Sequence, residues 1–502
     1  MRPDLSFFSM KYKFGFPMSQ IGAYWWPIGL FVFGLVFRYF WVDVRDLCID
    51  EPFSVYHAQK SPAEIIRFSV TTEPNPPLYM LLLHFVMQLF GDSVVSVRSL
   101  SVIFSSLTGV LLFSISKRFS NVSGGLIAWA LFTFSTAHLV FGSEARAYPL
   151  FRLEFILLVW SWLKLQETAR SKSIWLIHTI TAVALLYTHY LGAIVLAVSG
   201  ILSLLLCADK KFSFQFILAY TIAALLWLPL LLPAWEVITK RGENSLHFLP
   251  EFWHFKYQLV SVWNGDLNYE HFMLLFLCCL TYLLSSKNTA RKLHLYIALA
   301  GVLNYVTLYF GSQWVWFFSD NYLLFTTLTI YITLGIFAGK AVSKFPVVSY
   351  VLLAILLLPY FRQFNPLPKN LTYREVKSSI AAVQQLRQAN EPVFLSPTWT
   401  ALPYTYYAYP AIFKLPENEL DSVLYVNKHF KIEQASEIEG RLAGATAFIL
   451  YLDEYTGTNP IGELPKGFIV KDSILIPEVY LVLYCALDSN LLSTSSADTV
   501  LN

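Results

Sequence analysis

Two acidic residues stand side by side just beyond the first long apolar segment of the chain. Asp50 and Glu51 follow the apolar residues 21–41. A positioned carboxylate can accept the proton that an attacking hydroxyl group must lose. Two adjacent carboxylates can also divide such roles between them. Most Asp-Glu pairs in exposed loops are only solvated, so this pair indicates chemistry only in combination with other groups.

A second polar cluster combines a carboxylate, a guanidinium group and a phenol. Glu144, Arg146 and Tyr148 lie between two apolar segments. Arginine binds phosphate oxygens through paired hydrogen bonds and stabilises the charge that develops on a phosphate leaving group. A structural ion pair between Glu144 and Arg146 is the alternative. The residues therefore predict either a phosphate site or a structural pair.

Two smaller polar groups have the same kind of surroundings. Glu73 and Asn75 precede the double proline at 76–77, and His189 and Tyr190 separate two apolar segments. Aromatic rings at such a site could pack against a sugar face or a lipid chain. His189 could equally serve as an ordinary hydrogen-bonding residue. The five cysteines show neither a disulfide framework nor metal-ligand spacing.

The segments that must position these residues are too apolar for a soluble protein. Of the 502 residues, 56% are hydrophobic and only 14% are charged, whereas soluble domains average about 25% charged residues. A membrane helix needs about 20 mostly apolar residues. We therefore predict a polytopic α-helical membrane protein with about eleven spans. They are residues 21–41, 97–116, 124–142, 148–164, 174–188, 190–207, 213–233, 271–285, 293–311, 320–339 and 345–361.

One apolar stretch is left out of these spans. Residues 76–90 are short and open with two prolines, which favours a re-entrant or interfacial helix. Without this stretch, the basic loops all fall on one side of the membrane, which the positive-inside rule makes cytoplasmic. We therefore expect a cytoplasmic N-terminus that is retained as an anchor. The polar clusters then share the outer face, where a common site is geometrically allowed.

The chain divides into three predicted parts. Residues 1–362 form a transmembrane catalytic domain with outer loops 42–97 and 234–270, residues 363–488 form an extracytoplasmic α/β domain, and residues 489–502 form a disordered tail. In the α/β domain we expect a helix at 373–388. The expected strands are residues 392–395, 423–426, 447–452, 468–470 and 479–483.

The order of these motifs resembles the GT-C glycosyltransferases, in the bacterial and archaeal branch related to protein O-mannosyltransferases and aminoarabinose transferases. The matching residues are Ile49-Asp50-Glu51, Glu73-Pro74-Asn75-Pro76-Pro77-Leu78-Tyr79, Phe90-Gly91-Asp92-Ser93 followed by Arg98, Ser143-Glu144-Ala145-Arg146-Ala147-Tyr148, Tyr187-Thr188-His189-Tyr190-Leu191-Gly192 and Tyr373-Arg374-Glu375. The likeness covers nearly the whole chain. It is weakest in the later spans and the distal α/β domain.

The resemblance implies an inverting glycosyltransferase of a bacterial inner or archaeal plasma membrane. It would move a hexose or pentose from a polyprenyl-monophosphate carrier to a glycan, lipid or protein outside the cytoplasm. Asp50 corresponds to the base, Glu51 to its orienting or acceptor-binding neighbour, and Arg146 to a phosphate contact. The family usually has Asp where Glu73 stands. Some relatives hold a divalent metal ion and others act without one, so no metal ligand is assigned.

Two other functional classes fit parts of the pattern. A transporter or flippase of lipid-linked sugars would place its site near the middle of the bilayer, often between repeated halves. The polar motifs here gather instead at one surface, and the sequence shows no internal repeat. A glycan polymerase or ligase with a diphosphate-linked donor differs only in donor chemistry. The sequence does not identify the sugar, the acceptor or the oligomeric state.

Overall fold

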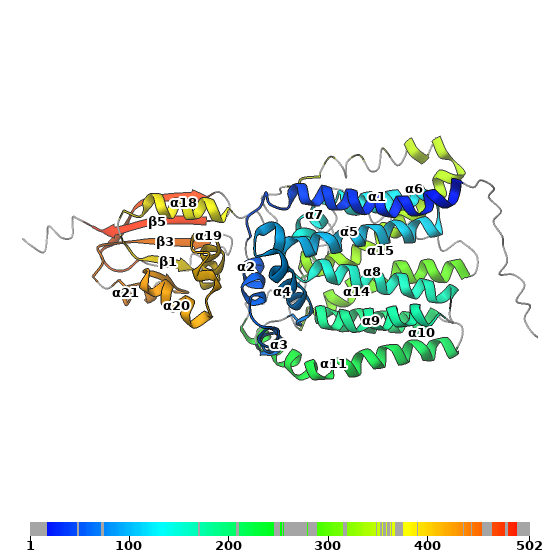
Figure 1. The fold of residues 1–502 in the computed structure, drawn as a ribbon, viewed down its shortest axis with the longest axis horizontal. Coiled ribbons are helices and arrows are strands. Elements are labelled where there is room, and N and C mark those ends of the chain that lie inside the picture. Colours follow the sequence, from blue (N-terminus) through cyan, green and yellow to red (C-terminus); the bar gives the residue numbers. More distant parts are fainter. Residues whose placement is uncertain are drawn as a thin grey trace, which may run out of the picture.

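The computed structural model places a bundle of helices first and an α/β domain last (Figure 1). The described residues are 18–47, 50–71, 75–168, 171–206, 210–244, 289–314, 319–347, 375–388, 390–434, 436–442, 444–453, 464–476 and 480–488, with short pieces within 251–279 and 349–366. The long helices are α1 (Met18–Trp41), α5 (Val94–Phe119), α8 (Tyr148–Glu167), α9 (Lys172–Thr188), α10 (Leu191–Leu206), α11 (Lys210–Asn244), α14 (Thr289–Gly311) and α15 (Asp320–Lys344).

Most of the predicted spans coincide with helices of this bundle. The exceptions are residues 271–285 and 345–361, which fall largely outside the described residues. Judged by length and composition, four described helices could cross a membrane, or five if one bent pair counts as a single span. The polytopic helical architecture is therefore confirmed, whereas the count of eleven spans stays a prediction.

The predicted span 124–142 is broken in the middle. It consists of α6 (Val122–Thr133) and α7 (Thr136–Ser143), whose axes differ by 64°. The Ser135 side chain accepts a hydrogen bond from the His138 backbone and thus caps a new helix. Hydropathy could not reveal this break, because both halves are apolar. The bend brings the end of α7 to the candidate site.

Close contact between α6 and α15 depends on small residues. A Cβ atom at Gly124 would lie 2.5 Å from the Gly335 carbonyl oxygen and 3.2 Å from the Gly339 Cα atom. Glycines four residues apart let two membrane helices approach at backbone distance. Most of α15 is buried among the other helices. This contact holds α6 against α15.

Three short helices cover the end of the bundle that faces the α/β domain (Figure 1). They are α2 (Asp50–Ala58), α3 (Pro62–Thr71) and α4 (Leu78–Phe90). The Ser61 and Glu64 side chains form reciprocal caps at the start of α3. Helix α4, predicted as a re-entrant or interfacial segment, has 13 residues, about 20 Å at 1.5 Å per residue. It is too short for an ordinary crossing.

The C-terminal α/β domain contains a five-stranded sheet in the order β2-β1-β3-β5-β4. Strand β1 is parallel to β2 and β3, whereas β5 is antiparallel to β3 and β4. The strands are β1 (Val393–Ser396), β2 (His429–Lys431), β3 (Ala447–Asp453), β4 (Phe468–Ile476) and β5 (Tyr480–Leu487). The helices are α18 (Val376–Leu386), α19 (Ala401–Ala408), α20 (Glu417–Val426) and α21 (Ser436–Glu439), with 3₁₀ turns η2 (Thr398–Thr400) and η3 (Ile412–Lys414).

One predicted strand of this domain is wrong. Residues 423–426 form the last turn of α20. Leu420 and Leu424, four residues apart, are buried, whereas Val426 is exposed. That is the helical period, and it overrides the β-branched residues of this short segment. The strand of this region is β2, which comes directly afterwards. The limits at 363 and 488 stay predictions.

The α/β domain docks on α2 and on the loop before it through hydroxyl and lysine contacts. The Leu47 N–H donates to the Tyr407 hydroxyl at 2.6 Å, and Tyr56 donates to the Leu415 carbonyl at 2.9 Å. The Lys377 ammonium lies 3.0 Å from an Asp46 carboxylate oxygen. An apolar cluster that includes Leu47, Val55 and Leu420 continues across the boundary. The domain therefore helps to shape the loop that carries Asp50 and Glu51.

Candidate active site

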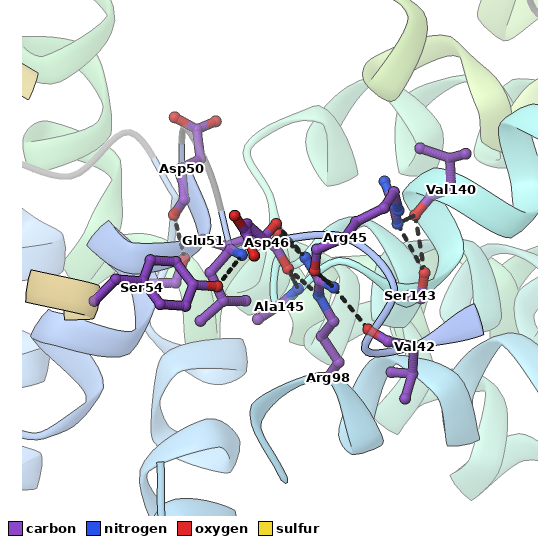
Figure 2. Close-up of polar contacts among 12 residues, drawn as sticks. Val42, Arg45, Asp46, Asp50, Glu51, Ser54, Arg98, Val140, Ser143 and Ala145 are labelled. Carbon is purple, nitrogen blue, oxygen red and sulfur yellow. Dashed lines mark hydrogen bonds and ion pairs between the residues drawn. The ribbon is translucent and has the colours of Figure 1, made fainter. Parts of the chain in front are cut away.

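Helix α2 presents its two acidic residues in opposite ways. The Asp50 side chain is 54% exposed, whereas that of Glu51 is 3% exposed. Figure 2 shows the Asp50 carboxylate pointing away from the polar cluster that surrounds Glu51. Successive residues of a helix lie on different faces, and here one face turns outward while the other turns to the bundle. The two carboxylates therefore have different roles.

Glu51 is bound from two sides. Arg98 donates from Nε to Oε1 at 2.8 Å and from Nη2 to Oε2 at 2.6 Å, the paired geometry of a strong ion pair. The Ala145 backbone N–H donates to Oε1 at 2.9 Å. This carboxylate thereby joins α2 to α5 and to the turn before α8. Its lone pairs are largely occupied.

Arg98 also fixes the backbone that leads to α2. Its Nη1 group donates to the carbonyls of Val42 and Arg45 at 2.7 and 2.8 Å, and Nη2 donates to that of Asp46 at 2.9 Å. With the two bonds to Glu51, these contacts match the five N–H donors of a guanidinium group. The side chain is fully buried. Arg98 is therefore the centre of the scaffold beneath Asp50 (Figure 2).

Arg45 attaches the same loop to the broken helix. Its Nη2 group donates to the Val140 carbonyl at 3.0 Å and to the Ser143 hydroxyl at 3.1 Å. These residues end α7, where a cation is favoured by the helix dipole and by carbonyls without a helical partner. The bend between α6 and α7 thus has a direct effect on the loop. Arg45 and Arg98 hold that loop from two directions.

Arg146 lies between the exposed carboxylate and the interior. Its Nη2 atom is 3.4 Å from Asp50 Oδ2, and Nη1 donates to the Ser54 hydroxyl at 2.9 Å. The guanidinium carbon is 5.9 Å from the centre of the Tyr148 ring, a cation–π distance. The arginine itself is buried. A preorganised cation is therefore next to an accessible carboxylate.

Aromatic rings extend this site into the bundle. The Tyr148 ring centre is 5.9 Å from that of His189 and 5.6 Å from that of Tyr322. His189 Nδ1 accepts a hydrogen bond from the Leu191 N–H at 3.1 Å. Tyr190 lies farther out, and its hydroxyl donates to the Ser69 carbonyl of α3 at 3.5 Å. Of the two predicted residues, His189 therefore packs among aromatic rings, whereas Tyr190 contacts α3.

Arg152 holds the turn that carries Glu144 and Arg146. It donates to the Phe141 carbonyl at 2.5 Å and lies 3.1 Å from His138 Nδ1. His138 Nε2 is in turn 2.8 Å from the Thr327 hydroxyl of α15. These buried contacts tie α7, α8 and α15 together below the site. A polar network of this kind fixes side-chain positions when its members are paired.

Glu144 lies in the same region with an unusual protonation equilibrium. The side chain is buried. Burial, followed by the charge of Glu51, raises the pKa of Glu144 from 4.5 to about 7, although Arg45 and Arg98 oppose the shift. A carboxyl group that titrates near neutral pH can exchange protons at little cost. The buried Glu144 carboxyl can therefore be protonated near neutral pH.

The described residues contain no group of three His, Cys, Asp or Glu side chains that could hold a metal ion. Glu73 lies outside these residues. The neighbouring Asn75 is buried immediately before α4. Among the described residues, the site sets the Asp50 carboxylate beside the Arg146 guanidinium.

One family model and several solved structures are similar to this chain. A family model described as dolichyl-phosphate-mannose-protein mannosyltransferase matches residues 74–236. ArnT from Cupriavidus metallidurans, solved with undecaprenyl phosphate, is 12% identical with a TM-score of 0.56 over 91% of this chain and 98% of that chain. The chain is therefore similar to the GT-C membrane glycosyltransferases in fold and, over residues 74–236, in sequence. It is a multi-pass membrane protein.

An archaeal GT-C structure gives a similar result. The Archaeoglobus fulgidus oligosaccharyltransferase is 11% identical with a TM-score of 0.52, over 87% of this chain and 70% of that chain. The oligosaccharyltransferase AglB from Archaeoglobus fulgidus, solved in complex with an inhibitory peptide and a dolichol-phosphate, is 10% identical with a TM-score of 0.53, over 86% of this chain and 70% of that chain. No curated protein matches the sequence significantly. At these identities the likeness establishes the fold.

The GT-C fold brings most of the predicted site residues to one end of the bundle. Contacts link Asp50 to Arg146, Arg146 to Tyr148, and Tyr148 to His189. Glu51 lies in the scaffold below Asp50, and Tyr190 contacts α3. These residues come from three segments of the chain, near residues 50, 146 and 189. Their common location explains why none of the motifs was decisive alone.

Other residues of this GT-C site were not among the predicted site residues. Arg98 appeared only in a motif, although a charge within an apolar span is itself a signal, since it is costly without a partner. Arg45 and Ser54 carried no comparable signal. Tyr322 and Tyr407 lie far along the chain in segments without a distinctive motif. Only the fold could place Tyr322 beside Tyr148 and Tyr407 beside Leu47.

Proposed function

We propose that this GT-C protein transfers a sugar from a polyprenyl-monophosphate carrier to an acceptor at the outer membrane surface. The observation that carries the proposal is the contact between the exposed Asp50 carboxylate and the buried Arg146 guanidinium. This contact pairs an accessible base with a phosphate-binding cation. The lipid phosphates named for the ArnT and AglB structures support a donor of this class.

In the proposed reaction, Asp50 accepts the proton of the acceptor hydroxyl as the oxygen attacks the anomeric carbon. The bond from that carbon to the phosphate oxygen breaks with inversion, and the polyprenyl phosphate leaves as an anion. Arg146 stabilises this anion by hydrogen bonds and charge. Tyr148 and His189 line the donor side, and Tyr190, Asn75 and Glu73 are further candidates for donor binding. Residues 1–362 form the catalytic domain, with the site on the non-cytoplasmic face of a bacterial inner or archaeal plasma membrane.

Glu51 has a positioning role in this proposal. Its carboxylate is bound by Arg98 and the Ala145 N–H, so it holds α2 in place beneath the exposed base. Glu144, with a pKa of about 7, is suited to adjust the charge of the site as the phosphate anion forms. Asp50 therefore remains the residue that contacts the acceptor. The identity of the sugar is left to experiment.

The test measures turnover of lipid-linked sugars by purified protein. Lipid extract and an envelope fraction from the producing cells supply donor and acceptor, and mass spectrometry follows the release of free polyprenyl phosphate. Asp50→Asn should lower that release about 100- to 10,000-fold, the usual contribution of a general base. Asp43→Asn is the matched control, because Asp43 is an exposed acid of the same loop.

Three results would contradict the proposal. A well-folded Asp50→Asn protein with normal release of polyprenyl phosphate would exclude Asp50 as the base. Movement of sugar lipids across a vesicle membrane without bond breakage would support a transporter or flippase. Consumption of a diphosphate-linked oligosaccharide in place of the monophosphate donor would indicate a polymerase or ligase.

A further inference from the structure

A cleft of about 470 Å³ lies between the first outer loop and the α/β domain. Its walls come from the end of α2 and from α3 on one side, and from η3 and the start of α20 on the other. The volume falls within the range of small-molecule sites, about 300–1,000 Å³. This cleft is separate from the cluster of Asp50, Glu51 and Arg98. Its lining includes Tyr56, Lys60, Arg67, Phe68, Lys414 and Glu417.

Positive charge in this cleft is only partly compensated. Lys414 pairs with Asp92 at 2.8 Å. Lys60 and Arg67 form no ion pair within the described part of the chain. The Glu64 carboxylate is oriented by the backbone N–H and hydroxyl of Ser61. Lys60 interacts electrostatically with the Glu64 carboxylate, so Arg67 is the main cation available to an anionic ligand and Lys60 is a weaker one.

Aromatic and carboxylate groups complete the lining. The Lys60 ammonium lies 5.2 Å from the Tyr56 ring centre and 5.5 Å from that of Phe68. Phe68 is held by a stack on His57, with ring centres 3.7 Å apart. Rings of this kind pack against the apolar face of a sugar. Glu417, at the start of α20, can accept hydrogen bonds from sugar hydroxyls.

Helix α2 connects this cleft to the proposed base. Tyr56 comes six residues after Asp50 in the same helix, which corresponds to roughly 9 Å along the axis at 1.5 Å per residue. An acceptor more than one sugar unit long could reach both places. The cleft is thus at a suitable distance for the part of the acceptor that does not react.

We propose that this cleft binds the acceptor through a sugar unit that carries a phosphate or carboxylate group. The proposal rests on the proposed glycosyl transfer, because it assigns the cleft to that reaction's acceptor. Arg67 and Lys60 bind the anionic group, and Tyr56 and Phe68 contact the sugar ring. Binding at this distance positions the acceptor hydroxyl near Asp50, and the residues of the cleft take no part in the proton transfer.

Binding is tested with glucose 6-phosphate, glucuronic acid and glucose as probes on the full-length protein in neutral detergent. Isothermal titration and ligand-observed NMR measure the affinities. Glucose 6-phosphate should bind at least tenfold more tightly than glucose, and Arg67→Gln should remove most of that difference. Lys60→Gln should give a smaller loss. Lys471→Gln is the control, because Lys471 is an exposed residue of β4, at the edge of the sheet opposite to β2.

The results separate this proposal from the proposed reaction. The Asp50→Asn protein should bind glucose 6-phosphate normally, whether or not transfer is observed. Equal affinities for glucose 6-phosphate and glucose, or unchanged binding by Arg67→Gln, would overturn the proposal for the cleft alone. Displacement of the probe by phosphatidylglycerol micelles at matched phosphate concentration would also overturn it, since the cleft would then prefer a lipid headgroup to a sugar.

Discussion

Replacement of Arg98 by methionine should release the loop that carries Asp50. Arg98 is fully buried and binds both oxygens of Glu51 as well as the carbonyls of Val42, Arg45 and Asp46. Methionine fills similar space but offers no hydrogen-bond donor. Glu51 would then be a buried carboxylate without its cation. Both the stability of the protein and the position of Asp50 should suffer.

The size of this effect follows from the burial of the pair. Removal of one partner from a buried ion pair costs about 3–5 kcal/mol, mostly because the other charge stays behind. Glu51→Gln in addition to Arg98→Met removes that charge and should recover a large part of the loss. The two sites are in direct contact, so a coupling of about 2–3 kcal/mol is expected.

Arg118→Met is a matched control for the same substitution. Arg118 pairs with Glu167, but both side chains are partly exposed, and exposed pairs contribute only about 0–1 kcal/mol. The four proteins of this cycle are the wild type, Arg98→Met, Glu51→Gln and the double variant. Tryptophan fluorescence follows their unfolding and that of the control in detergent, and release of polyprenyl phosphate is measured alongside. An Arg98→Met protein no less stable than Arg118→Met, or effects that simply add in the double variant, would refute the reasoning.

Three further predictions concern the surroundings of Asp50. Burial raises the pKa of Glu144 to about 7, so the wild-type protein should lose on the order of 3 kcal/mol of stability as pH rises from about 4.5 to 7. The Glu144→Gln protein should lose less. Unfolding temperatures of both proteins measured across this pH range test this, and parallel curves would contradict it. Tyr407→Phe leaves the buried Leu47 N–H without its hydroxyl partner and should lower the free energy of unfolding by about 1–3 kcal/mol. Denaturant unfolding measures this loss, and unchanged stability and turnover would exclude a docking role for Tyr407. Arg146→Lys keeps the charge but loses the planar pair of donors, so the rate of transfer should fall about 10- to 100-fold in the polyprenyl phosphate assay. Equal rates for this variant and the wild type would exclude Arg146 from the phosphate site.

The overall architecture was predictable because each long helix of the bundle is apolar over most of its length. Segments such as 97–116 and 320–339 are apolar throughout, and the structure has α5 and α15 there. The break at Ser135 was not predictable, since it depends on one side-chain cap between two apolar halves. The error at 423–426 arose because four residues are too few to distinguish a strand from a helix turn.

The site was predictable in its residue types but not in its division of roles. The sequence placed Asp50 and Glu51 in one loop, yet the start of a helix exposes the first and buries the second. The decisive partner of Glu51 is Arg98, 47 residues away, and the loop is also held by Tyr407, 360 residues after Leu47. Such pairs follow from the fold and not from local periodicity.

The most direct test of the proposed function is mass spectrometry of lipids that co-purify with the Asp50→Asn protein. A variant that binds the donor but cannot activate an acceptor should retain a polyprenyl monophosphate that carries one sugar, and the same spectrum would identify that sugar. Asp43→Asn protein should contain far less of it, because turnover continues. Recovery of a diphosphate-linked oligosaccharide, or of ordinary phospholipid alone, would contradict a monophosphate-dependent transferase with Asp50 as its base.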